Sequence, residues 1–121
     1  MLNFNSVMIG SMQPKVLASF YEKVFGRCAD MEDCGYWGWQ FGSASFTLGE
    51  HSEAGGKSKD PVRVILNFET EEVEKEFERI KAIEGAEVIA EPYELSGAWL
   101  ATFADPDGNY FQLITPWEEE K

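Results

Sequence analysis

Only a few side chains in this chain of 121 residues are suited to acid–base or metal chemistry. His51 is the single histidine, and it directly follows Glu50 at the start of a Gly-rich stretch. The two cysteines, Cys28 and Cys34, have no second Cys or His pair with which to complete a zinc site. Carboxylates surround them, whereas a catalytic thiol needs a basic neighbourhood. We therefore expect reduced structural thiols and take Glu50 as the candidate catalytic base.

The charge balance bears on the partners of the protein. The chain has 22 acidic and 10 basic residues, for a formal net charge of −12. A phosphate backbone or an anionic membrane surface would be repelled, so neither nucleic acid nor a membrane is an expected partner. Solubility explains the acidity by itself, while a cationic ligand would be attracted by it. No basic region followed by an apolar run opens the sequence, so we expect a cytoplasmic protein.

Hydrophobic spacing predicts the elements of the first half. Apolar residues recur at helical intervals after Pro14, which suits a first helical turn, and Gly26 suits a helix end. The spacing then changes to two residues, which is typical of a hairpin. The predicted elements are a strand, a helix and two hairpin strands, over Ser6 to Ser11, Pro14 to Phe25, Tyr36 to Phe41 and Ala44 to Glu50.

The second half repeats this order after a flexible connection over residues 51–60. A Phe lies on the inner face of each predicted helix (Phe20 and Phe77), and a glycine closes each one (Gly26 and Gly85). This recurrence predicts an internal repeat. The predicted elements are a strand, a helix and three strands, over Val62 to Phe68, Glu71 to Glu84, Ala86 to Glu91, Trp99 to Ala104 and Tyr110 to Thr115.

Two segments carry a resemblance to a known superfamily. Phe103 to Leu113, which reads FADPDGNYFQL, resembles the final hairpin of the vicinal oxygen chelate superfamily. That superfamily includes glyoxalase I, extradiol dioxygenases, fosfomycin-resistance thiol transferases and bleomycin-resistance proteins. Ala18 to Gly26 resembles its first helix. Because the two segments lie toward opposite ends of the chain, the resemblance covers nearly all of it.

The resemblance implies an α+β fold in which two βαβββ modules form a curved mixed sheet around a cavity. It implies a single domain over residues 1–121, with module one at about 1–52 and module two at about 61–117. Superfamily members commonly form homodimers, so a homodimer is expected here. The last residues, Glu118 to Lys121, are expected to form a disordered tail.

The resemblance also implies positions for the ligands of a divalent metal. Metal-using members carry His, His and Glu where this chain has Ser6, Ile65 and Gln112. Hydroxyl, aliphatic and amide side chains bind such metals poorly. Glu50, His51 and Gln112 are therefore only weak candidate ligands. No cofactor is expected, although a divalent metal remains the alternative.

A ligand-binding face follows from the same positions. If Ser6 and Gln112 point into the cavity, strand alternation places Met8, Arg63 and Asn67 there as well. The same alternation adds Tyr110, and the rings of Trp37, Trp39 and Trp99 are nearby aromatic candidates. The whole predicted set is Ser6, Met8, Trp37, Trp39, Arg63, Asn67, Trp99, Tyr110 and Gln112. Alternatively, the aromatic rings fill the core and Arg63 extends to solvent.

Two functions from different classes are compatible with this chain. The first is a metal-free small-molecule-binding protein, similar to the bleomycin-resistance branch, that sequesters an aromatic or cationic ligand. The alternative is a lyase, isomerase or dioxygenase-type enzyme with an atypical or metal-dependent site. In that case Glu50 would act as a general base and Arg63 would stabilise an enolate-like oxygen.

Overall fold

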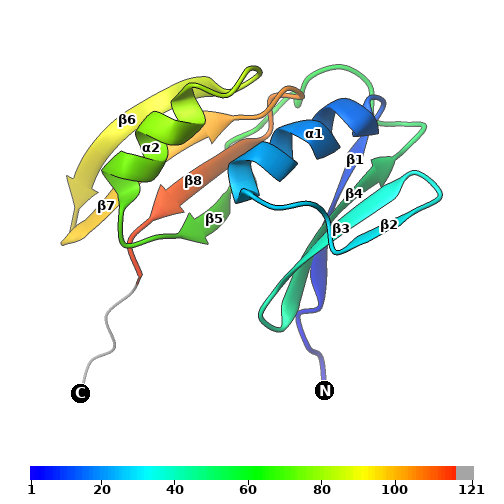
Figure 1. Cartoon of the computed structure of the whole chain (residues 1–121), viewed down its shortest axis with the longest axis horizontal. Helices are drawn as coiled ribbons and strands as arrows, with labels where there is room; N and C mark the ends of the chain where they lie inside the picture. The colour runs from blue at the N-terminus through cyan, green and yellow to red at the C-terminus, as the bar shows by residue number, and fades with distance from the viewer. Residues whose placement is uncertain (117–121) are drawn as a thin grey trace. The chain divides into compact units, whose positions relative to one another are not determined.

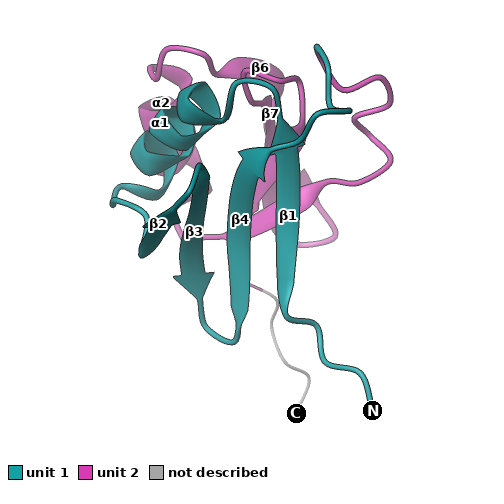
Figure 2. Ribbon diagram, turned by 90° about the vertical axis from the view of Figure 1, so that its right-hand side faces the viewer, with its two compact units in different colours: residues 1–56 teal, residues 57–121 magenta. Residues whose placement is uncertain are grey.

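A computed structural model describes residues 1–116 and divides the chain into two compact units (Figure 2). Unit 1 ends at Gly56 and unit 2 begins at Lys57. This division falls inside the predicted connection over residues 51–60. Neither helix of the described residues has the length and apolar character needed to cross a membrane.

Unit 1 is a four-stranded sheet with one helix, α1, on one of its faces (Figures 1 and 2). The strand order is β1-β4-β3-β2, in which β1 runs parallel to β4 and the other neighbours are antiparallel. The elements are β1 (Ser6–Ser11), α1 (Pro14–Phe25), β2 (Met31–Asp33), β3 (Tyr36–Phe41) and β4 (Ala44–Glu50).

An aromatic core joins α1 to this sheet. The ring of Tyr21 lies 4.7 Å from the ring of Phe46, and Phe25 lies 5.3 Å from Trp39. Helix α1 starts at a proline, whose missing N–H costs nothing at a first turn. It ends at Gly26, whose φ of 73° is readily adopted without a side chain, and whose N–H donates to the Glu22 carbonyl.

Unit 2 repeats the arrangement with helix α2 (Figure 1). The strand order is β5-β8-β7-β6, with β5 parallel to β8. Phe103 lies between two rings, 5.2 Å from Phe77 of the helix and 5.6 Å from Phe111. The elements are β5 (Leu66–Glu69), α2 (Val73–Lys81), β6 (Glu87–Leu95), β7 (Ala98–Ala104) and β8 (Tyr110–Ile114).

The turn between β7 and β8 is organised by one buried carboxylate. Asp105 is 2% exposed, and its Oδ1 accepts hydrogen bonds of 2.9 Å from the backbone N–H groups of Asp107 and Asn109. The Asn109 amide adds a contact of 3.0 Å to the other oxygen, Oδ2. Gly108 adopts a φ of 80°, which favours glycine. The D-P-D-G-N sequence therefore specifies a rigid connection rather than a site.

The repeated strand–helix–strand order and the α+β class predicted from the sequence are confirmed. Several boundaries differ, because period-two reading does not detect very short or irregular strands. Strand β2 was not predicted, β5 begins at Leu66 rather than Val62, and β6 extends to Leu95. Helix α2 ends at Lys81, well before Gly85. The predicted module end at residue 117 and the tail Glu118 to Lys121 lie outside the described residues.

Candidate ligand-binding site

Each sheet has one face that contacts its helix and another that does not, here called the helix-free face. In unit 1, Phe46 and Leu48 of β4 are buried against α1, so the residues between them belong to the helix-free face. Register pairs carry this assignment across the sheet: Met8 pairs with Thr47, and Gly38 pairs with Thr47 from the other side. The strand residues of the helix-free face are Ser6, Met8, Gly10, Met31, Asp33, Tyr36, Gly38, Gln40, Ser45, Thr47 and Gly49.

Large apolar side chains are exposed on the helix-free face of unit 1. Met8 is 50% exposed, Met31 45% and Tyr36 41%. Ser6 lies beside Ser45, whose hydroxyl donates a 2.6 Å hydrogen bond to the Gln40 side chain. Thioether and aromatic groups with hydroxyls at one end are typical of surfaces that bind organic molecules.

Two glycines at one end of this face are each covered by a side chain. A Cβ atom on Gly49 would lie 2.1 Å from Cδ1 of Tyr36, so the Tyr36 ring rests directly on the Gly49 backbone. A Cβ atom on Gly10 would lie 2.8 Å from Cβ of His51. Gly10 and Gly49 are register partners in adjacent strands. Tyr36 and His51 therefore occupy neighbouring positions on the helix-free face.

The helix-free face of unit 2 carries most of the polar residues predicted for that half. Phe111 and Leu113 face α2, so Tyr110 and Gln112 face away from it. Asn67 pairs with Gln112 and shares its face. Asn67 is exposed, whereas Thr102, the partner of Gln112 on β7, is 5% exposed. Ser6, Met8, Asn67, Tyr110 and Gln112 thus lie on helix-free faces, and their roles in ligand binding stay predictions.

The predicted placement of Trp37 and Trp39 with Ser6 is wrong. Trp39 is 1% exposed, contacts Phe25 of α1, and donates a 3.0 Å hydrogen bond from its indole nitrogen to the Arg27 carbonyl. Trp37 shares its face by alternation. Trp39 is buried under the helix and Trp37 is half-buried on the same face, because that face of the hairpin forms the core. The alternative reading, in which the aromatic rings fill the core, describes them.

Arg63 does not lie in a strand, so the alternation argument that placed it beside Asn67 does not hold. Its backbone N–H donates to the Asp60 carbonyl in a turn before β5, and its guanidinium makes a 3.2 Å ion pair with the Asp60 carboxylate. The Arg63 side chain is 80% exposed. An exposed pair of this kind contributes little to stability. Arg63 is thus a solvated turn residue, as the alternative reading expected.

The candidate base and the histidine lie on different faces. Glu50 alternates with Leu48 and pairs with Ser11, which places it on the helix-bearing side. His51 lies over Gly10 on the helix-free face, and its Nδ1 accepts a 3.2 Å hydrogen bond from the Glu53 N–H. This bond puts the ring proton on Nε2 in the neutral form.

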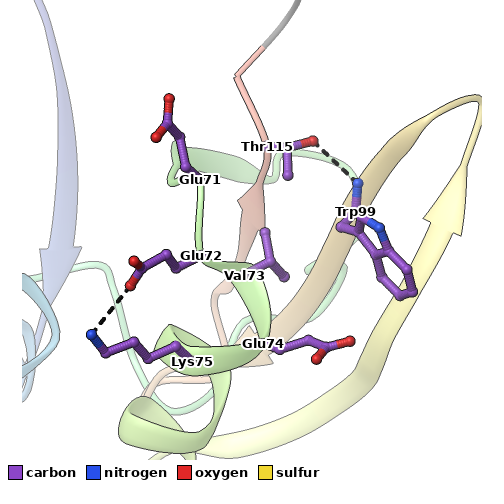
Figure 3. A pocket seen from close by; sticks show the side chains of 7 residues that line it. All are labelled: Glu71, Glu72, Val73, Glu74, Lys75, Trp99 and Thr115. Atoms are coloured by element: carbon purple, nitrogen blue, oxygen red, sulfur yellow. Dashed lines mark hydrogen bonds and ion pairs between the residues drawn. The ribbon is translucent and has the colours of Figure 1, made fainter.

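Trp99 lines a pocket of about 410 Å³ on the helix-bearing side of unit 2 (Figure 3). Its ring is 38% exposed, and its backbone N–H donates to the Thr115 hydroxyl. Glu74 extends from α2 to the side of Trp99, whereas Glu72 points away and pairs with Lys75 at 3.3 Å (Figure 3). Carboxylates at the start of a helix are stabilised by the helix dipole. This accounts for the glutamates beside the pocket without a bound ligand. The lining residues are Glu71, Glu72, Val73, Glu74, Lys75, Trp99 and Thr115.

Two ionisable groups with shifted pKa values lie near the end of α1. The backbone N–H of Gln40 and then the guanidinium of Arg27 bond the Asp30 carboxylate and hold its pKa below the usual value. A hydrogen bond to the Glu22 carboxylate raises the pKa of the Cys28 thiol. Both groups are exposed and belong to the helix-bearing side. Asp30 therefore bears on local stability and Cys28 on thiol reactivity, and neither is part of the candidate binding face.

The donor groups do not fit the divalent metal of the superfamily. Within residues 1–116, no three His, Cys, Asp or Glu side chains gather where they could hold an ion. The helix-free faces instead offer Ser6 and Gln112 at the superfamily positions, with uncharged oxygen donors. Divalent ions of this kind need imidazole or carboxylate ligands. The further candidates, Glu50 and His51, belong to opposite faces.

The sequence also matches a family model, that of the glyoxalase-like domain, over residues 6–114. The chain belongs to the glyoxalase-like domain family. This confirms the resemblance to the vicinal oxygen chelate superfamily that the two sequence segments indicated. The comparison with curated proteins found no significant match for this glyoxalase-like chain.

Solved structures share the glyoxalase-like fold along nearly the whole chain. A glyoxalase/bleomycin resistance protein from Albidiferax ferrireducens is 19% identical, with a TM-score of 0.76, over 93% of this chain and 98% of that one. A lactoylglutathione lyase from Agrobacterium tumefaciens is 17% identical, with a TM-score of 0.74, over 98% of each chain. A glyoxalase-related enzyme from Fulvimarina pelagi is 16% identical, with a TM-score of 0.77, over 96% of this chain and 89% of that one. At these identities the matches show the fold alone.

Sequence reasoning missed Tyr36, Asp33 and Gly49 as candidates of this glyoxalase-like domain. The signal was present in the hairpin. Counting back from the two-residue turn pairs Tyr36 with Gly49, out of phase with the core tryptophans. Trp37 and Trp39, the larger rings of this strand, were predicted as ligand-binding residues instead, although they lie on the other face.

Proposed function

We propose that this glyoxalase-like protein binds a small aromatic or cationic molecule without the help of a metal ion. The observation that carries the proposal is the helix-free face of unit 1. Three large apolar side chains, Met8, Met31 and Tyr36, are between 41% and 50% exposed on this face. Exposed apolar groups gathered on one surface commonly mark a binding site. Ser6, the superfamily's first metal-ligand position, lies on the same face and offers only a hydroxyl.

Binding is favoured over catalysis by the placement of the residues that catalysis was expected to use. Glu50 belongs to the helix-bearing side of its sheet, and Arg63 lies in an exposed turn as the partner of Asp60. A general base and an oxyanion-stabilising group must both reach one reacting molecule. Neither residue lies on a helix-free face, so this pair supports no acid–base step.

The proposal is tested first by metal content and then by ligand titration. The purified protein is incubated with excess Zn²⁺, Ni²⁺, Mn²⁺ and Fe²⁺, freed of unbound ions, and analysed by elemental mass spectrometry. We expect no stoichiometric ion. A set of neutral, cationic and anionic aromatic compounds is then titrated into ¹⁵N-labelled protein, and amide shifts are recorded by NMR. We expect shifts in β1, β3 and β4.

Matched variants separate the candidate face from the rest of the chain. Met8→Ala and Tyr36→Leu change the helix-free face of unit 1, whereas Trp99→Phe changes the pocket on the helix-bearing side of unit 2. We expect only the first two to weaken binding. A retained ion in stoichiometric amount, or shifts confined to the surroundings of Trp99, would contradict the proposal. The expected homodimer and cytoplasmic location stay predictions, and light scattering tests the first.

A further inference from the structure

We infer that Tyr36 and Asp33 recognise a flat organic cation, and that Gly49 is the residue that positions Tyr36 for this role. The inference rests on the proposed ligand binding and names the ligand class for that face. It follows from the way three neighbouring strands place an aromatic ring, a carboxylate and a bare backbone side by side.

The Tyr36 ring is held in position by the Gly49 backbone on which it packs. A Cβ on Gly49 would lie 2.1 Å from Cδ1 and 2.3 Å from Cε1 of this ring, so only glycine allows the ring to lie on the strand. Packing of an aromatic ring on a cross-strand glycine stabilises a hairpin. It also leaves the other side of the ring available, because Tyr36 is 41% exposed. A ring held in one orientation loses little entropy when a flat ligand stacks on it.

The charge of this face favours a cation. Asp33 is the register partner of Tyr36 and the only charged strand residue on the helix-free face of unit 1. It has no ion-pair partner within residues 1–116. The basic side chains of unit 1 belong to the other side: Lys15 and Lys23 lie in α1, and the Arg27 guanidinium lies 5.1 Å from the ring centre of Phe41.

The neighbouring side chains complete a bounded surface. His51 lies over Gly10, next to the Tyr36–Gly49 pair, and its Nε2 has no hydrogen-bond partner in the described part of the chain. Met31 lies two residues along the sheet from the Tyr36 position, with its terminal methyl over Gly38. A cation on the exposed ring face would gain cation–π attraction, which an uncharged ring of the same shape lacks. The net charge of −12 adds long-range attraction.

The test uses three probes of one shape: N-methylquinolinium, quinoline and quinoline-carboxylate, which are cationic, neutral and anionic at neutral pH. Each is titrated into the ¹⁵N-labelled full chain, and the dissociation constant is taken from amide shifts of residues 31–50. We expect the cation to bind at least about fivefold more tightly than quinoline, which a cation–π contact would provide. The anion should bind most weakly.

Variants then test each residue. Tyr36→Leu and Gly49→Ala should both weaken cation binding at least about fivefold, whereas Tyr36→Phe should stay within about twofold. Gly55→Ala is the matched control for Gly49→Ala, because Gly55 lies outside the strands of this face and its Cβ would meet only the Met12 sulfur, at an ordinary contact distance of 3.6 Å. Asp33→Asn should reduce the preference for the cation without changing quinoline binding. Circular dichroism checks that each variant folds. If Gly49→Ala does not fold, the result for Tyr36→Leu tests the inference instead.

Equal dissociation constants for the three probes, or a Gly49→Ala or Tyr36→Leu variant that binds the cation as the wild type does, would overturn the inference. Binding of only quinoline or its carboxylate would also overturn it, yet would leave the proposed ligand binding intact. If no probe or screened compound shifts any amide at millimolar concentration, both proposals fail together.

Discussion

The indole nitrogen of Trp39 donates a 3.0 Å hydrogen bond to the backbone carbonyl of Arg27, just beyond the end of helix α1. This bond ties the hairpin β3–β4 to the chain that leaves the helix. It also assigns the ring to the core, since Trp39 is 1% exposed and contacts Phe25 and Phe46. A tryptophan held in this way stabilises the fold and is not accessible to a ligand.

Replacing Trp39 by Phe should therefore destabilise the protein. The variant leaves the part-buried Arg27 carbonyl without its donor, which costs about 1–3 kcal/mol, and the smaller ring adds a packing loss. Urea unfolding followed by circular dichroism measures the change. Trp99→Phe is the control, because that ring is 38% exposed, and we expect a loss below about 1 kcal/mol. Equal losses in the two variants would contradict this account.

The carboxylate of Asp105 should contribute more to stability than any exposed ion pair. Asp105→Ala removes the acceptor of two backbone N–H groups in the β7–β8 turn, and hydrogen bonds to a charged acceptor are worth roughly 1.5–3 kcal/mol. Asp60→Ala removes the exposed partner of Arg63 and should cost less than about 1 kcal/mol. Thermal or urea unfolding of both variants checks the order, and the reverse order would show that the turn is not the rigid element described.

The lowered pKa of Asp30 predicts a pH-dependent contribution to stability. A carboxyl group whose pKa is depressed on folding stabilises the protein above its unfolded pKa, near 3.8. The contribution is lost as the pH falls through the lower folded pKa. Asp30→Asn should therefore be less stable than the wild type at neutral pH, and the difference should shrink as the pH falls below about 3.8.

The matched control is Asp33→Asn, which alters an exposed carboxylate of the same hairpin without a hydrogen-bond partner in the described residues. The difference between the two variants then isolates the contribution of the hydrogen bonds to Asp30. Urea unfolding at several pH values measures both variants. A stability gap for Asp30→Asn that persists unchanged in acid would show that the carboxylate's charge is not its cause.

Cys28 should become more reactive when Glu22 loses its charge. The Glu22 carboxylate accepts a 3.5 Å hydrogen bond from the thiol and raises the pKa of Cys28, so less thiolate is present near neutral pH. Glu22→Gln should increase the rate of Cys28 alkylation by iodoacetamide at mildly alkaline pH. Peptide mass spectrometry follows both cysteines, with Cys34 as the internal control whose rate should not change. An unchanged Cys28 rate would remove Glu22 as the cause.

The sequence was sufficient for most of the fold because the local patterns agreed with the tertiary arrangement. Strand β1, the two hairpin strands β3 and β4, and helix α1 have the predicted bounds. Pro14, Gly26 and the Gly42-Ser43 turn act locally, so their effects can be read from neighbouring residues alone. Strand β2, with three residues, and the start of β5 could not be predicted, since pairing rather than local periodicity defines them.

The face on which each side chain lies was decided by tertiary structure. Strand alternation puts Trp37 and Trp39 on one face of β3 and Tyr36 on the other, but it does not say which face meets the helix. That choice depends on where α1 packs, and the larger aromatic set becomes the core because burying it removes more apolar area from water. Arg63 was misplaced for a different reason: the parallel pairing of β5 with β8 begins only at Leu66, so Arg63 lies outside the strand. The glycine beneath Tyr36 is visible in the sequence, yet its role as a support for the ring exists only once β3 and β4 are paired.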